Sequence, residues 1–140
     1  LDFSSDSAVE LFLEKSGFYP DKLDKKAIKT AYEKLLPTIV GLAPLNNGDQ
    51  AVDASTKELS IVFSKPMIPK RYSISLSKKG ELYFPIKSIK GYKEDEKTLV
   101  LNIELKPQQD YEFVITNRGF KSKDGYALKD EEYLIKFRTK

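Results

Sequence analysis

The chain has no cysteine and no histidine, and these two absences exclude much of enzyme chemistry. Without cysteine there can be no disulfide, thiol nucleophile or thiolate metal site. Without histidine there can be no Ser-His-Asp or Cys-His arrangement, and the common zinc patterns are excluded too. The seven glycines are isolated from one another, so a glycine-rich phosphate-binding loop is also excluded. Paired carboxylates could still support glycosidase chemistry.

Long apolar runs and a strong charge of one sign are also missing. No stretch of about 18 apolar residues exists, so we expect no membrane span. The net charge of +3 comes from 24 basic and 21 acidic residues of mixed order. A nucleic-acid-binding protein would more often carry a basic stripe, whereas here only short clusters occur, such as 65–71 and 121–123. We therefore expect no nucleic-acid partner.

The first quarter of the chain has the period of a helix. Ser7 and Glu10 form a capping-box pattern, and Gly17 is a suitable residue to end this first helix. A second helix is predicted from Asp24, its N-cap, to Pro37, which cannot continue it. The apolar stripe of this second helix consists of Ile28, Ala31, Tyr32, Leu35 and Leu36.

Two short helices cannot bury their apolar stripes by themselves. One interpretation is that they pack on each other and on one end of the following domain. The other is that they belong to an upstream domain of a longer polypeptide, which fits a chain that begins with Leu1 rather than Met. The interdomain contact would then be an apolar patch. Its side chains would be Ile28, Tyr32, Leu35 and Leu36.

After Pro37 the apolar period changes to two, the period of a half-buried strand. The predicted strands are 38–43, 59–63, 72–76, 82–86, 89–92, 99–103, 111–115 and 133–137. Pro85 interrupts its segment, which predicts an edge strand. Many short alternating strands with no helices between them favour a mainly β fold. We therefore predict a helical segment over 1–37 and an antiparallel β-sandwich of seven or eight strands over 38–140.

The corner between two of these strands has a recognisable pattern. The stretch Leu105–Tyr111 contains a proline and brings the chain round into the strand that Tyr111 begins. A tyrosine at this point can pack its ring inside and direct its hydroxyl to the backbone of the corner, as in the tyrosine corner of Ig sandwiches. The pattern predicts this arrangement for Tyr111.

An ordered set of segments also carries a resemblance to a known family. The segments are Pro44-Leu45-Asn46-Asn47-Gly48 with Ala51-Val52-Asp53, then Glu58 to Met67, then Thr98 to Leu101 with Leu105-Lys106-Pro107 and Tyr111 to Ile115, then Lys123 to Leu128 with Ile135 to Thr139. At this spacing, residues 42–140 resemble the bacterial Ig-like domain of surface-layer proteins and many secreted bacterial proteins. The resemblance implies a Greek-key sandwich. It also implies an exported protein that is periplasmic, on the cell surface or secreted.

The acidic groups are the candidates for catalytic or calcium-binding residues. They are Asp49 with Asp53, Glu94 with Asp95 and Glu96, and Asp130 with Glu131 and Glu132. All lie in predicted turns, where solvated carboxylates are common. Calcium needs six to eight oxygen ligands, and its Asp-x-Asp-x-Asp-Gly type of spacing is missing. We therefore expect no catalytic residue, metal or cofactor.

Three functions remain open after these exclusions. The first is a non-catalytic accessory module of a longer exported bacterial protein, which spaces or docks an upstream domain of the same polypeptide. The second is binding of a glycan or cell-envelope polymer, or of a protein, at the cell surface. Tyr83, Tyr92 and Tyr126 are the candidate ligand contacts, because tyrosines near loops can stack on sugar rings. The third is a carboxylate-dependent hydrolase. It would need a concave cleft with two acidic side chains at close range, and the sequence gives no reason to expect one.

Overall fold

The computed structural model describes residues 25–140, and the chain divides into two compact units, Leu1–Leu36 and Pro37–Lys140. In the first unit, helix α2 comprises Lys25–Glu33. This confirms the second predicted helix, whereas the first lies outside the described residues. The prediction of helix up to Leu36 was wrong, since 34–36 form a turn in which the N–H of Leu36 donates to the carbonyl of Glu33. The α conformation is disfavoured immediately before a proline.

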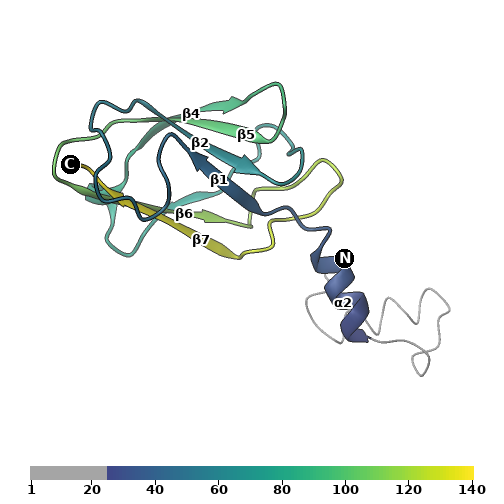
Figure 1. Ribbon diagram of the computed structural model, residues 1–140. Helices are drawn as coiled ribbons and strands as arrows, with labels where there is room; N and C mark the ends of the chain where they lie inside the picture. Colours follow the sequence, from purple (N-terminus) through teal and green to yellow (C-terminus); the bar gives the residue numbers. More distant parts are fainter. Residues whose placement is uncertain (1–24) are drawn as a thin grey trace. The chain divides into compact units, whose positions relative to one another are not determined.

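The second unit is a sandwich of two antiparallel sheets, as predicted (Figure 1). Its seven strands are β1 (Ile39–Ala43), β2 (Glu58–Phe63), β3 (Ile74–Leu76), β4 (Ile86–Tyr92), β5 (Thr98–Ile103), β6 (Asp110–Thr116) and β7 (Glu132–Arg138). The sheet orders are β1-β2-β5-β4 and β3-β6-β7. This is the strand order of a constant-type immunoglobulin sandwich.

The core lies between the sheets and follows the period of two. On β2, for example, Leu59, Ile61 and Phe63 are buried, whereas Glu58 is exposed. One end of the core is aromatic, and the rings of Phe63 and Phe120 there have centroids 5.4 Å apart. Removal of these apolar side chains from water is the main force that holds a cysteine-free sandwich together.

The prediction of a strand over 82–86 was wrong. Glu81–Tyr83 form a 3-10 turn, and Leu82 is 83% exposed. The chain must cross here from β3 in one sheet to β4 in the other, and Phe84 packs edge-on against Phe113 at 6.4 Å between centroids. Strand β4, which starts directly after Pro85 and carries two register irregularities, is one edge strand of the four-stranded sheet.

The tyrosine corner is present as predicted. The hydroxyl of Tyr111 accepts a hydrogen bond of 2.7 Å from the backbone N–H of Lys106, and its ring stacks on Phe137. Buried Thr139 fastens the same corner, because its hydroxyl donates to the carbonyl of Lys106 at 2.6 Å and accepts from the N–H of Gln109. The corner thus joins the start of β6 to the residue after β7.

The chain enters the second unit at Pro37 and leaves it at Lys140, and the two ends of the sandwich are called the Pro37 end and the Lys140 end. At the Pro37 end, the carbonyls of Pro37 and Thr38 accept hydrogen bonds from the N–H groups of Lys129 and Ser64. At the Lys140 end, the carbonyl of Lys140 accepts from the N–H of Gln108. Strand β7 runs between these ends, so the chain enters and leaves at opposite ends of the sandwich (Figure 1).

Candidate functional site

The loop carboxylates brace turns of the backbone. Asp95 accepts three hydrogen bonds, from the hydroxyl of Thr98 at 2.7 Å and from the N–H groups of Lys97 and Thr98 at 3.0 Å. Asp53 accepts from the N–H and the hydroxyl of Ser55 at 2.8 and 2.7 Å. The Thr98 hydroxyl is the main cause that lowers the pKa of Asp95, and the N–H of Ser55 does the same for Asp53. Lowered pKa values suit ionised turn braces and not general acids at neutral pH.

The lowered pKa of Asp95 predicts a loss of stability in acid. In the folded chain this pKa lies below its unfolded value of about 4, so its contribution is complete above that value and is lost as the pH falls through the folded pKa. We expect Asp95→Asn to be less stable at pH 7 and to lose less further stability between pH 5 and pH 2. Urea denaturation across this pH range measures both effects. Equal pH slopes for the variant and the parent would contradict the prediction.

The acidic groups do not converge on a metal site. Among residues 25–140, no group of three or more carboxylates lies close enough together to hold an ion. Glu131 and Glu132 are exposed at the start of β7, whereas Asp53 is near the Lys140 end and Asp95 in the β4–β5 turn. The structure therefore separates the three acidic groups of the sequence.

The three candidate tyrosines do not form one platform. Tyr83 lies in the 3-10 turn, whose Leu82 carbonyl accepts a hydrogen bond from Gln109 near the Lys140 end. Tyr92 ends β4 towards the Pro37 end, where its ring stacks on Tyr72 at 6.1 Å. Its hydroxyl is buried and finds no hydrogen-bond partner among residues 25–140, and this burial raises its pKa. Tyr92 is thus part of the aromatic core, and its role as a ligand contact stays a prediction.

Tyr126 lies in a group of loops that ion pairs tie together. The ammonium of Lys65 lies 4.9 Å from the ring centroid of Tyr126 and pairs with Asp124. Lys123 pairs with Glu96 of the β4–β5 turn. These partly exposed pairs orient the loops, although each contributes little to stability.

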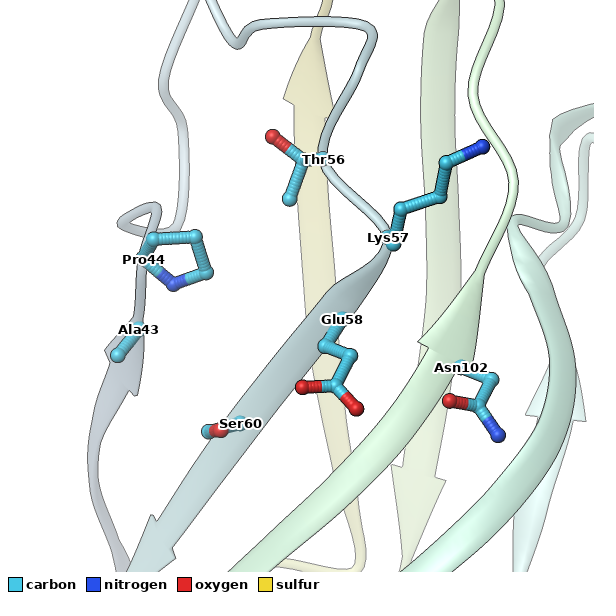
Figure 2. A pocket seen from close by; sticks show the side chains of 7 residues that line it. All are labelled: Ala43, Pro44, Thr56, Lys57, Glu58, Ser60 and Asn102. Carbon is cyan, nitrogen blue, oxygen red and sulfur yellow. The ribbon is translucent and has the colours of Figure 1, made fainter.

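A shallow open hollow of about 640 Å³ lies on the outer face of the four-stranded sheet, towards the Lys140 end. It is lined by Ala43, Pro44, Thr56, Lys57, Glu58, Ser60 and Asn102 (Figure 2). Glu58 and Asn102 are register partners on β2 and β5. Both already bind β4, since Glu58 pairs with Lys90 at 2.8 Å and Asn102 donates to Ser88 at 2.9 Å. The hollow has no aromatic lining, and its two central polar groups are engaged.

In the first unit, the predicted contact residues are only partly covered. Ile28, Tyr32 and Leu36 are half-buried, and Leu35 is 45% exposed. The helix is too short to span a membrane, and the same holds for every helix in the described part of the chain. The role of the four residues in an interdomain contact stays a prediction.

One feature was missed in the sequence, where 44–48 was interpreted only as a turn. The segment 47–52 runs parallel to β7 along its outer edge, with a bridge between Val52 and Thr139. The side-chain amide of Asn47 extends this pairing as a backbone amide would. It donates a hydrogen bond to the carbonyl of Leu134 and accepts one from the N–H of Lys136. The buried Leu45 before the segment and the buried Val52 at its end are the signal that could have indicated it.

Comparison with solved structures finds similar sandwiches. CopC from Methylosinus trichosporium OB3b is 23% identical with a TM-score of 0.55, over 74% of this chain and 92% of that one, which indicates a shared fold. The S-layer protein rSbsC(31-844) is 24% identical over 81% of this chain and 15% of that chain, with a TM-score of 0.48. The N-terminal part of S-layer protein SbsC is 25% identical over 83% and 26%, with a TM-score of 0.49. No curated protein matches the chain.

The family comparison agrees with the strand order and with the resemblance noted in the sequence. Residues 34–139 match the family model of the bacterial Ig-like domain, which covers all seven strands and the tyrosine corner. The match spans well over half of the chain. The chain therefore belongs to the family of bacterial Ig-like domains.

Proposed function

We propose that this domain is a non-catalytic module of a longer exported bacterial protein, in which it spaces or docks a neighbouring domain. The observation that carries the proposal is the in-line path of the chain, which enters at the Pro37 end and leaves at the Lys140 end. A domain of this kind separates the parts of the polypeptide on its two sides by its own length. The seven residues of β7 alone account for roughly 20 Å at about 3.3 Å per residue.

The chemistry of the side chains supports the same proposal. The chain has no histidine or cysteine, and Asp53 and Asp95 are engaged as ionised braces of turns. The loops at the Pro37 end are fastened to one another by ion pairs such as Lys123 with Glu96. The two packed sheets and the covered edge of β7 give a body of fixed length, which is what a spacer requires.

A tandem array tests the spacing role. Two, three and four copies of the full chain are joined and their maximum dimension is measured by small-angle X-ray scattering. Each added copy should lengthen the array by the same amount, which should be at least roughly 20 Å. An array whose dimension grows irregularly, as in a freely jointed or collapsed chain, would overturn the proposal.

The docking role and the glycan alternative need a second experiment. Deletion of residues 38–140 from the parent protein should change its stability or partner binding while the chemistry of the other domain persists. Screening of the isolated chain on a glycan array should give no saturable binding. Saturable binding that is lost in Tyr83→Ala or Tyr126→Ala would favour the glycan role instead. Tyr92→Ala is unsuitable as a probe, because Tyr92 stacks in the aromatic core.

A further inference from the structure

The contacts between segment 47–52 and β7 join the two terminal parts of the sandwich. Six hydrogen bonds connect segment 47–52 to β7 and to Lys140, two residues beyond it, and two of these bonds use the side chain of Asn47. The backbone bonds are Gly48 N–H to Lys136 carbonyl at 2.7 Å, Arg138 N–H to Asp49 carbonyl at 2.8 Å, Val52 N–H to Arg138 carbonyl at 3.0 Å and Lys140 N–H to Val52 carbonyl at 3.0 Å. We call this set the terminal patch.

The direction of the terminal patch decides how it responds to tension. A load on a spacer acts between the Pro37 end and the Lys140 end, along the axis of β7. Segment 47–52 is parallel to β7. The load reaches segment 47–52 through β1, from the Pro37 end, and it reaches β7 through its C-terminal residue, from the Lys140 end. The hydrogen bonds run from one strand to the other, slanted as in other parallel pairs, and not along this load. They are therefore sheared together and are not opened one after another.

Strand β1 places a second sheared contact before the terminal patch. Its register with β2 runs from Ile39 opposite Phe63 to Ala43 opposite Ser60. Tension that enters at Pro37 pulls β1 along its own axis against β2. If β1 slides free, the terminal patch is the next direct link between the two loaded segments.

We infer that the terminal patch is a mechanical clamp that keeps the domain folded under tension along the polypeptide. This inference rests on the proposed spacing function and adds resistance to force to it. The clamp needs no ligand, because the resistance comes from simultaneous rupture of several hydrogen bonds. The inference gives the side chain of Asn47 a mechanical role, which its exposed position would not otherwise suggest.

Single-molecule pulling tests the clamp directly. Because the chain has no cysteine, cysteines added at its two ends give unique attachment points on the full chain. Unfolding of Pro37–Lys140 is recognised because the unfolded segment extends to roughly 350 Å, at about 3.4 Å per residue, and so adds nearly this length to the chain. Attachment at Ala51→Cys and the C-terminus instead loads the terminal patch from one end, so that its bonds open in sequence. The domain should resist a higher force in the end-to-end geometry, and equal forces in the two geometries would overturn the clamp.

Two asparagine variants, one inside the terminal patch and one outside it, separate the clamp from general stability. Asn47→Ala removes two bonds of the terminal patch and should speed end-to-end unfolding at fixed force roughly tenfold. Asn102→Ala removes the bond to Ser88 between β5 and β4, away from the loaded segments, and should leave that rate nearly unchanged. Equal accelerations would overturn the inference. If the pulling results agree with the clamp but the tandem array grows irregularly, the spacing role alone is refuted. If the array grows regularly but the pulling results contradict the clamp, the clamp alone is refuted.

Discussion

Replacement of Phe113 by alanine is expected to lower the free energy of unfolding by about 3–5 kcal/mol. Phe113 is fully buried on β6, the central strand of the three-stranded sheet, and its ring meets Phe84 edge-on at 81°. Alanine would remove most of this apolar area and leave a cavity that neighbouring strands can fill only in part. The total free energy of unfolding of a domain of this size is about 5–15 kcal/mol, so the variant would be close to unfolding at 37 °C.

Urea denaturation followed by far-UV circular dichroism measures this loss, with tyrosine emission as a second probe because the chain has no tryptophan. The matched control is Val114→Ala, one residue further on β6. Val114 is half-buried on the other face, opposite Leu134, and its replacement by alanine should lower the free energy of unfolding by about 1 kcal/mol or less. Since a shift of one residue exchanges the two faces of a strand, similar losses at both positions would contradict the register of β6.

The strands could be predicted wherever burial alone imposes a period of two. Leu59, Ile61 and Phe63 alternate with more exposed residues on β2 because only one of its faces meets the other sheet. The same period misled the prediction at 82–86, where Leu82 is exposed and Phe84 points to the core from a crossover. Period and apolar content do not report that a chain is leaving one sheet for the other. That change of direction is set by the pairing of β3 and β4 with different sheets.

The predictability of individual contacts depended on their separation along the chain. The bond between Tyr111 and Lys106 spans five residues, so a local corner pattern predicts it. The bond between Asn47 and Lys136 spans 89 residues, and nothing near Asn47 indicates its partner. For the same reason the sequence placed Tyr83, Tyr92 and Tyr126 near loops but could not tell that these loops lie at opposite ends of the sandwich. Long-range strand pairing, which no local pattern records, decides which loops meet.

Gly119→Ala is expected to destabilise the domain by about 1–3 kcal/mol through a steric clash. A Cβ atom at Gly119 would lie 2.6 Å from the carbonyl oxygen of Tyr72 and 3.0 Å from the Cβ of Ser73. The backbone cannot easily yield here, because the N–H of Gly119 donates to the Ser73 hydroxyl at 2.7 Å and that hydroxyl donates to the carbonyl of Thr116. The loop after β6 is thereby fixed against the start of β3.

The control for this prediction is a second glycine whose surroundings are open. A Cβ atom at Gly41 on β1 would meet no atom within 4 Å, and the backbone of Gly41 is not left-handed. Gly41→Ala should therefore be neutral or slightly stabilising, since alanine lowers the conformational entropy of the unfolded chain. Thermal and urea denaturation of both variants compare the two sites. Loss of stability at Gly119 but not at Gly41 would attribute the cost to the close approach of Tyr72, whereas equal losses would assign it to the mere presence of a side chain and refute the clash.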